Sequence, residues 1–325
     1  VKNCQIHLNF EGPSEKIENF FKKIKPTLQE SIRDIEKNMK ARGGGLLDLT
    51  FVKKSDLLPH YFYIHASFET LDAMGANFIN SCLEKIADVF DKEAKLHEDF
   101  IETGTFPEVV MSILSNYVPD CLVRAEVSCP VEALSTKTMN GEDFAGKFVR
   151  AVNIAEVEVS RAVTHNKGIM NGIDAVVLAT GNDFRAVEAG VHAYASRDGV
   201  YRSLTHAEIE NDIFRFWIEV PLAIGTVGGL TSLHPMTGVA LEILQKPNAK
   251  ELMEIMAATG LAQNFAAVRS LITTGIQEGH MKMHLMNILN QLKATKAEKI
   301  SAVEYFKKQT ISHSAVEEFL MNQRT

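Results

Sequence analysis

The segment from Arg161 to Glu188, RAVTHNKGIMNGIDAVVLATGNDFRAVE, places charged residues at both ends of a strongly apolar run. Lys167 precedes this run and Asp183 follows it, and Asp174 is the only charged residue in the stretch 173–180. An apolar run without a polar face is typical of a helix that is buried all round. We therefore expect a buried central helix here, around which the larger part of the chain packs.

A lysine beside such a helix must find a partner or lose its proton, because burying a lone ammonium group costs several kcal/mol. Asp183 is the candidate partner that follows the run, so the pattern predicts a pair between Lys167 and Asp183. A buried pair with shifted pKa values suits a site that handles protons or stabilises an oxyanion. A structural ion pair has the same appearance in sequence, so both interpretations stay open.

The bulk composition indicates an ordinary globular protein. A chain of 325 residues can form two domains, and 46% hydrophobic with 23% charged residues fits no disordered or fibrous class. The formal net charge of −7 argues against nucleic acid as the main partner, because binding phosphates requires clustered Lys and Arg. No apolar run reaches membrane-spanning length and the first residues lack a secretory signal, so we expect no membrane partner and a cytoplasmic protein.

The four cysteines form no C-x-x-C pair and have no histidine at ligand spacing. Free thiols in a reducing compartment are the expected state, and neither a zinc site nor another metal site is predicted. The cysteines are Cys4, Cys82, Cys121 and Cys129.

Residues 1–117 show a self-contained pattern of strands and helices. Alternating apolar residues predict strands at 5–10, 46–52, 61–68 and 108–114. Helical spacing follows the first strand, with an interruption at Pro26, and follows the third strand from about Leu71. The order βαββαβ predicts an α+β domain of the ferredoxin-like type, with an antiparallel sheet and both helices on one side. This fold alone decides no function.

Residues 118–275 are predicted to form a larger, mostly helical domain, and residues 276–325 a helical C-terminal flap. A helix is expected over 138–160, and 217–235 combines a strand-like run with a Gly-rich bend. Three cap-x-x-Glu patterns predict helix starts in the last third of the chain. They are Asn248 with Glu251, Thr295 with Glu298, and Ser314 with Glu317.

Three further motifs each allow two interpretations. DAMGANFIN (72–80) fits a phosphate-binding helix start or an Asp cap followed by a packing glycine, and GTVGG (225–229) fits a phosphate cradle or a turn. His280 and His284 lie one helical turn apart, but no third ligand and no H-E-x-x-H accompany them. His280 fits either an acid on a mobile element or a surface histidine.

Several motifs together resemble the class II (bacterial) 3-hydroxy-3-methylglutaryl-CoA reductases, in the right order and from about residue 3 to the end of the chain. They are LDAMGANFIN, ILSN (113–116), THNKGIMNGIDAVVLATGNDFRAVEAG with HAYA (192–195), SLT (203–205), GTVGGLTSLHP, GLAQNFAAVRSL (260–271) and GIQEGHM (275–281).

This resemblance implies an oxidoreductase that reduces the CoA thioester to mevalonate and free CoA with two hydrides from NAD(P)H, or runs the reverse reaction. Lys167 would stabilise the oxyanion, Asp183 would hydrogen-bond and tune it, and His280 would protonate the CoA thiolate. The substrate and the nicotinamide cofactor are the implied small-molecule partners, and a site shared between subunits implies a homodimer or larger homo-oligomer.

The resemblance also implies binding residues. Arg161 matches a contact to the substrate carboxylate, and Asn171 and Gln263 match polar residues around the substrate. Glu36 matches an acidic residue near the adenine ribose, where it would favour NAD over NADP. The residues implied around the cofactor are Glu36, Asp72, Met74, Gly75, Asn77 and Asn116.

Two departures from the family pattern bear on activity. The family has a segment before the small domain with a catalytic glutamate in a Glu-Pro-Ser setting, and no counterpart occurs here. The second departure is Met286, which lies near the position where relatives carry a basic residue. The alternative function is therefore a catalytically incomplete CoA- or nucleotide-binding fragment. An RNA-recognition module is a third interpretation, which the acidic balance and the missing K/R-G-F-G-F pattern disfavour.

Overall fold

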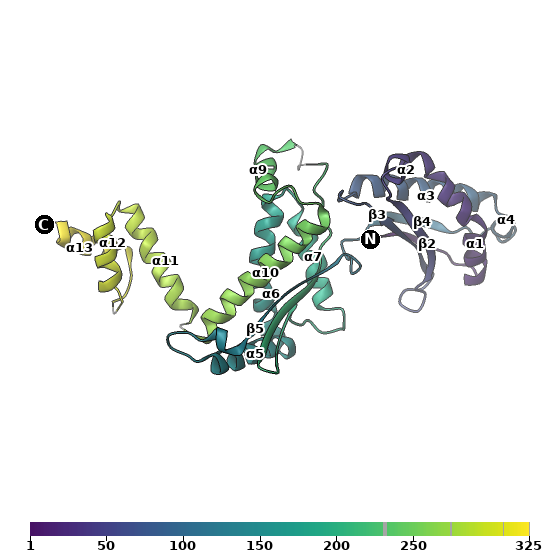
Figure 1. Ribbon diagram of the computed structural model, residues 1–325. Coiled ribbons are helices and arrows are strands. Elements are labelled where there is room, and N and C mark those ends of the chain that lie inside the picture. Colours follow the sequence, from purple (N-terminus) through teal and green to yellow (C-terminus); the bar gives the residue numbers. More distant parts are fainter. Residues whose placement is uncertain (230–232, 274, 308, 325) are drawn as a thin grey trace.

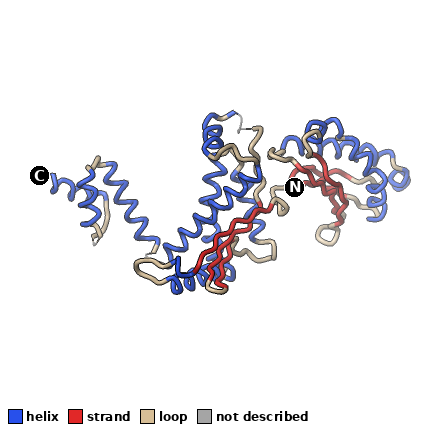
Figure 2. The backbone as a smooth tube through the Cα atoms, in the orientation of Figure 1, coloured by secondary structure: helices blue, strands red, loops and turns tan. Residues whose placement is uncertain are grey.

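The computed structural model describes residues 1–229, 233–273, 275–307 and 309–324. Three apolar cores lie in three successive segments, which we name the small domain (1–117), the large domain (118–275) and the flap (276–325). In Figure 1 the small domain lies at one end, the large domain in the middle, and the flap helices project from the other end. Figure 2 shows the strands gathered into two separate sheets, one in each domain.

The small domain alternates strands and helices. Its four strands form one antiparallel sheet in the order β2-β3-β1-β4, and buried residues alternate along β3 as in a strand with one face on a core. The predicted mixture of helices with an antiparallel sheet is confirmed. The elements are β1 Lys2–Asn9, α1 Ser14–Ser31, α2 Arg33–Lys40, β2 Gly45–Lys53, β3 Tyr61–Glu69, α3 Ala76–Leu96, α4 Glu98–Thr103 and β4 Glu108–Leu114.

Aromatic packing joins the helices of the small domain over its sheet. Phe20 of α1 meets Phe90 of α3 and Phe100 of α4 edge to face, with ring centroids 5.3 and 5.0 Å apart. Pro26 does not interrupt α1 as predicted: the helix continues to Ser31, and the break falls at Ile32, which ends α1 and precedes α2.

The large domain is less helical than predicted, because a three-stranded antiparallel sheet of order β5-β7-β6 forms one of its layers. Only β7 overlaps a strand-like run recognised in the sequence. In β6 the inward residues are Thr205 and Ala207, which give a weak apolar alternation. The elements are β5 Leu122–Pro130, the 3-10 helix Val131–Leu134, α5 Gly141–Val157, α6 Val159–Ala179, α7 Phe184–Ala195, β6 Thr205–Glu210, β7 Ile213–Pro221, α9 Pro235–Ile243 and α10 Ala249–Ile272.

The prediction that the central helix is buried all round is wrong for the single chain. One face of α6 packs into the core through Ile169, Ile173 and Val177, all fully buried. The opposite face is open: Val163 is 50% exposed and Leu178 is 58% exposed. The apolar run 173–180 showed no polar face, so the sequence did not reveal that the outer side of this helix has no cover among the described residues.

The flap forms a small helical unit with its own core. Its helices are α11 Ile276–Gln291, α12 Lys296–Tyr305 and α13 His313–Arg324. The capping boxes at Asn248 in the large domain and Thr295 in the flap are confirmed. The predicted cap at Ser314 is wrong, because Ser312 Oγ accepts the hydrogen bond from the backbone N–H of Ala315.

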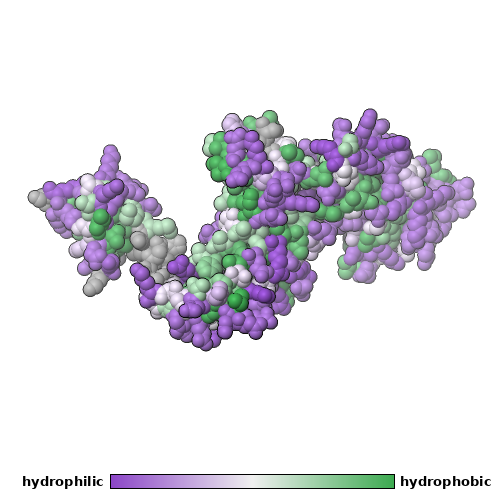
Figure 3. All heavy atoms as spheres, in the orientation of Figure 1, coloured by the Kyte–Doolittle hydropathy of each residue, from purple (hydrophilic) through white to green (hydrophobic). Residues whose placement is uncertain are grey.

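Apolar side chains reach the surface over the middle of the molecule, between the α9 and α5 regions (Figure 3). Among the described helices none is long and apolar enough to cross a membrane. All four cysteines are free thiols, and burial raises the pKa of Cys4 and of Cys82 to about 12.

Candidate functional site

The outer side of α6 carries two of the predicted site residues. Lys167 and Asn171 are one turn apart on the helix, so they lie on the same face, and both are exposed. Gln263 is exposed on α10, the helix that packs against α6. The predicted ammonium and the two predicted amides therefore occupy neighbouring helices.

Two glycines allow α6 and α10 to approach closely. A Cβ on Gly172 would lie 2.7 Å from the backbone oxygen of Thr259 and 2.9 Å from the Cβ of Gln263. A Cβ on Gly260 would lie 2.8 Å from the side chain of Ile173. These contacts are closer than packed atoms tolerate, so the helix spacing that places Gln263 next to α6 depends on both glycines.

The predicted buried pair of Lys167 and Asp183 is absent. Lys167 is exposed, and α6 rises about 18 Å between Lys167 and its last residue, Ala179, so Asp183 beyond that end is out of reach within one chain. Asp183 Oδ2 instead lies 3.1 Å from Arg185 Nη2. This separation follows from the sequence itself, because a helix formed by the apolar run places the charged residues at its two ends a helix length apart.

Asp183 has a clear structural task as the N-cap of α7. Its Oδ1 accepts hydrogen bonds from the backbone N–H of Arg185 at 3.0 Å and of Ala186 at 3.4 Å. Hydrogen bonding with the Arg185 guanidinium, followed by that with these backbone groups, holds the pKa of the Asp183 carboxyl below its usual range.

Arg161 is a half-buried cation in the first turn of α6. Burial lowers the pKa of its guanidinium. Its one side-chain contact is with His165, where Nη2 lies 3.4 Å from Nδ1, and no carboxylate pairs with it or with Lys167 among the residues that the structure describes. The carboxylate of Glu158 accepts from the backbone N–H of Arg161 at 2.9 Å, but the side chains of Arg161 and Lys167 have no ion-pair partner in the described part of the chain and can attract an anion.

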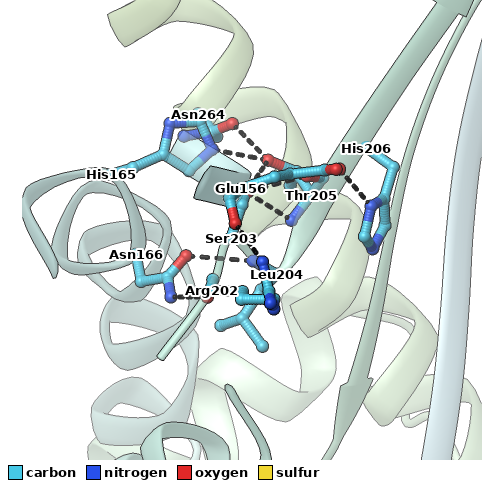
Figure 4. A network of polar contacts seen from close by, with 9 residues as sticks. All are labelled: Glu156, His165, Asn166, Arg202, Ser203, Leu204, Thr205, His206 and Asn264. Carbon is cyan, nitrogen blue, oxygen red and sulfur yellow. Dashed lines mark hydrogen bonds and ion pairs between the residues drawn. The ribbon is translucent and has the colours of Figure 1, made fainter. Parts of the chain in front are cut away.

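His165, the contact of Arg161, belongs to a network of polar groups, most of them buried (Figure 4). His165 Nε2 lies 2.6 Å from Thr205 Oγ1, which donates to Asn264 Oδ1 at 3.0 Å. Asn166 donates to the backbone oxygen of Arg202 and accepts from the backbone N–H of Leu204. The network fastens α6 and α10 to the start of β6.

Sequence reasoning assigned no role to these network residues, although THN and SLT were both recognised as motifs. The available signal was the pair His165 and Asn166 inside a mostly apolar helix, since buried polar side chains require partners. Their partners are remote in sequence, and no spacing rule could have found them.

The predicted cofactor residues divide into two groups. Met74 and Asn116 line one pocket between the small and large domains, together with Ala186 and Gly190 of α7. Gly75 is the N-cap of α3 with a φ of 82°, and Asn77 is exposed in the first turn of that helix. Asn77 thus offers an exposed side chain at the start of α3, whereas a Cβ on Gly75 would meet the side chain of Thr70 at 2.5 Å.

Asp72 serves the domain junction itself. Its Oδ1 accepts a hydrogen bond of 2.8 Å from the backbone N–H of Ala249, at the start of α10 in the other domain. Ala73 also forms an isolated parallel bridge with Val227. The predicted cap by Asp72 at the start of α3 is therefore wrong: the N-cap of α3 is Gly75, without a side-chain hydrogen bond, and Asp72 instead joins the small domain to the first turn of α10, whose own N-cap is Asn248.

Asn182 holds the opposite side of this junction. Its side-chain amide donates to the backbone oxygen of Gly225 at 3.0 Å and accepts from the N–H of the same residue at 2.8 Å. A Cβ at Gly225 would meet the backbone of Ala73 and Met74. The first glycine of GTVGG is thus a packing glycine, as the turn interpretation requires.

The predicted ribose contact of Glu36 is contradicted by its burial. Glu36 is 1% exposed, its Oε2 accepts from the backbone N–H of Leu46 at 3.1 Å, and its Oε1 pairs with Lys40. Each carboxylate oxygen has a partner within the small domain, so Glu36 holds α2 against β2, and its burial leaves it out of reach of a ribose hydroxyl.

Asp174 and Glu188 form a carboxyl pair that the sequence did not indicate. Burial, followed by the hydrogen bond and the negative charge of Glu188, raises the pKa of Asp174 to about 7. Asp174 Oδ1 is buried and receives no hydrogen bond within the described part of the chain. A proton on Asp174 allows the two carboxyl groups to share a hydrogen bond.

His280 lies in α11, but its side chain is outside the described residues. His284, one turn later, is exposed. Among the side chains that are described, no group of three His, Cys, Asp or Glu residues has the arrangement of a metal site.

The fold and these residues define a class of protein: a two-domain α+β protein with cations and amides on one helix pair, a helix start at the domain junction, and a helical flap. A model of the hydroxymethylglutaryl-coenzyme A reductase family matches residues 6–285, and the chain belongs to that family.

Relatives and solved structures agree with this assignment. The chain is 39% identical over 263 residues to the 3-hydroxy-3-methylglutaryl-coenzyme A reductase of Archaeoglobus fulgidus, which covers 81% of the chain and 56% of the relative. It is 35% identical over 291 residues to the probable reductase of Borreliella burgdorferi, covering 89% and 63%. The chain thus spans less than two thirds of the length of these two relatives.

Two structures of the Streptococcus pneumoniae reductase are similar throughout this chain. One covers 99% of this chain and 74% of its own, with a TM-score of 0.75 and 32% identity. The other, described as a class II reductase bound to NADPH in open conformations, covers 100% and 76%, with a TM-score of 0.75 and 33% identity. The family resemblance predicted from the sequence motifs is confirmed.

Proposed function

We propose that this chain provides the nucleotide and thioester sites of an enzyme that interconverts 3-hydroxy-3-methylglutaryl-CoA and mevalonate plus CoA. The observation that carries the proposal is the presence on α6 of two cations without an ion-pair partner among the described residues, Arg161 and Lys167, together with the amides of Asn171 on α6 and Gln263 on α10. The substrate has a free carboxylate, and the carbonyl oxygen of its thioester becomes an oxyanion when hydride adds to the carbonyl carbon, so two separate positive charges suit it.

Each residue has a distinct task in this proposal. Arg161 binds the substrate carboxylate, for which a guanidinium offers paired donors. Lys167 stabilises the oxyanion that forms when hydride reaches the carbonyl carbon. Asn171 and Gln263 supply hydrogen bonds around the substrate, and His280 protonates the departing CoA thiolate.

The hydride donor is a nicotinamide nucleotide, NADH or NADPH, bound at the start of α3. Gly75, Met74, Asn77 and Asn116 surround that start, and exposed N–H groups at a helix N-terminus favour phosphate. We also infer that the small domain is ferredoxin-like, with boundaries at 1–117. Asp72 acts indirectly here by joining the nucleotide domain to α10. Since Glu36 is buried, its predicted selection of NAD has no support.

The proposed assembly is a homodimer or a larger homo-oligomer with a shared site. The uncovered face of α6, with Val163 and Leu178 at least half exposed, leaves apolar area for a second copy to bury. If Asp183 tunes Lys167 as the family resemblance implies, it must come from that second copy, because the two residues of one chain are about 18 Å apart or more.

The test is a turnover assay in both directions. The chain is given 3-hydroxy-3-methylglutaryl-CoA with NADH or NADPH, and separately mevalonate and CoA with NAD+ or NADP+. Oxidation of the reduced nucleotide that depends on the thioester supports the proposal. CoA binding by calorimetry without turnover in either direction supports the incomplete fragment instead, and absence of both turnover and binding contradicts the proposal.

A further inference from the structure

The hydrogen-bond network behind Arg161 determines where His165 carries its proton. Ser203 Oγ donates to the backbone oxygen of Thr205 at 2.7 Å, so its single proton is used there. Thr205 Oγ1 donates its own proton to Asn264 Oδ1, which is a carbonyl oxygen and can only accept. The remaining contact of Thr205 Oγ1, at 2.6 Å from His165 Nε2, requires a proton on that nitrogen.

With a proton on Nε2, a neutral imidazole has a lone pair on Nδ1. His165 is 1% exposed, and burial, followed by the positive charges of Arg161 and His206, lowers its pKa to about 3. The ring is therefore neutral at physiological pH. The lone pair of Nδ1 faces Arg161 Nη2 at 3.4 Å, and the guanidinium can only donate.

We propose that His165 is a positioning residue for Arg161: a directed chain of hydrogen bonds from Arg161 through His165 and Thr205 to Asn264 aims the guanidinium at the substrate carboxylate. The inference rests on the proposed function for the identity of that carboxylate. These hydrogen bonds connect three elements, since Arg161 and His165 lie on α6, Thr205 begins β6 and Asn264 lies on α10. Figure 4 shows His165 and Asn264 both in contact with the hydroxyl group of Thr205.

A neutral acceptor suits this task better than a carboxylate. An aspartate or glutamate beside Arg161 would fix the guanidinium but would also neutralise it and compete with the substrate. The imidazole lone pair orients Arg161 and leaves its charge available, and the half-buried position strengthens its attraction to an anion.

The first test reads the tautomer of His165 directly. Histidine nitrogens are labelled with 15N in the intact chain, and the His165 signal is identified by its loss in His165→Asn. We expect a protonated Nε2 and an unprotonated Nδ1 from pH 8 to pH 5. Arg161 and His206, which Glu156 Oε1 contacts at 2.5 Å, are the charged or titratable groups facing the ring, and both oppose its protonation. A proton on Nδ1, or on both nitrogens in that range, would overturn the inference.

The second test uses two variants, each of which keeps one of the two hydrogen bonds of the His165 ring. His165→Gln extends its amide to the Nε2 position and still reaches Thr205, but has no acceptor beside Arg161. His165→Asn places a carbonyl oxygen near the Nδ1 position and keeps the acceptor for Arg161. We expect the KM for 3-hydroxy-3-methylglutaryl-CoA to rise about tenfold in the Gln variant and less than about threefold in the Asn variant. The KM for the nucleotide should stay unchanged in both.

The outcomes separate the inference from the proposed function. Equal KM values in the two variants, or parallel losses in both substrates, would show that His165 supports only the fold. An inactive wild-type chain would count against the proposed function alone, because the tautomer is read in the resting protein. A wrong tautomer in an active chain would count against the inference alone.

Discussion

The two sides of α6 contrast sharply. On the inner side His165 and Asn166 are buried, and each has hydrogen-bond partners from other elements. On the outer side Lys167 and Asn171 are exposed, and Lys167 has no ion-pair partner among the described residues. The inner side, with its hydrogen-bond partners, fixes the position of the helix. The exposed outer side is available to a ligand or a second copy.

Replacing Lys167 by Ala should give the largest effect on activity. Removing one oxyanion-stabilising group costs roughly 100- to 1,000-fold in rate, and an exposed side chain contributes little to stability. We expect thioester reduction to fall by at least about 100-fold with an unchanged thermal midpoint. Lys147→Ala, on the exposed side of α5, is the matched control and should keep full activity. Retained turnover in Lys167→Ala would show that the outer face of α6 takes no part in catalysis.

Two glycines of α6 should respond in opposite directions. Gly172→Ala forces a Cβ against the backbone of Thr259, so we expect a loss of about 1–3 kcal/mol in the free energy of unfolding. Gly168→Ala meets no atom within 4 Å and should gain up to about 1 kcal/mol from helix propensity. Urea denaturation at low protein concentration measures both.

The same pair of variants sharpens the proposal of a second copy. If Gly168→Ala is stabilising in dilute protein but weakens assembly in sedimentation experiments, the outer face of α6 is covered in the oligomer. Equal losses of stability for Gly168→Ala and Gly172→Ala would contradict the contrast between the faces.

Asp174 should make stability depend on pH. Its folded pKa of about 7 lies above the ordinary value of 3.8, so the folded state holds a proton that the unfolded chain has released between those values. Stability must therefore fall as the pH rises through this window. Asp174→Asn should remove the fall and gain about 1 kcal/mol at pH 8, after allowance for solvent screening, with little change at pH 4.

The matched control for this prediction is Asp198→Asn, which changes an exposed carboxyl outside the core clusters. Thermal melts at pH 4, 6 and 8 would measure both variants. A gain for Asp174→Asn that is the same at each of these pH values would show that charge sharing with Glu188 is not its cause.

The sequence was sufficient for features that depend on local spacing. The strands of the small domain, the helical nature of 161–179 and the caps at Asn248 and Thr295 all follow from periodicity or short motifs, and all are present. The motif order also identified the family, which the match over residues 6–285 confirms.

Features that depend on remote partners were not predictable in the same way. Asp72 was placed at the start of α3 by its position in the chain, but its hydrogen-bond donor is Ala249, far along the sequence. Glu36 was assigned to a ligand because it matches an acidic position of the family that it resembles, and its burial, with a hydrogen bond from the backbone N–H of Leu46, depends on the sheet. Helix α6 was predicted to be buried all round because composition gives the hydrophobicity of a face and not whether another element covers it.

The smallest expected effect separates the two tasks of Asp183. As the N-cap of α7 it accepts from the backbone N–H groups of Arg185 and Ala186, so Asp183→Ala should cost about 1 kcal/mol. Asp183→Asn keeps an accepting oxygen and loses an exposed ion pair with Arg185, so its cost should stay within about 0.5 kcal/mol. Because the folded pKa of Asp183 is depressed, the contribution of its charge is present above the ordinary carboxyl pKa and is lost as the pH falls through the folded value. A turnover loss in Asp183→Asn with a preserved melting temperature would show that the carboxylate acts on the outer face of α6, and full turnover would leave Asp183 with its cap alone.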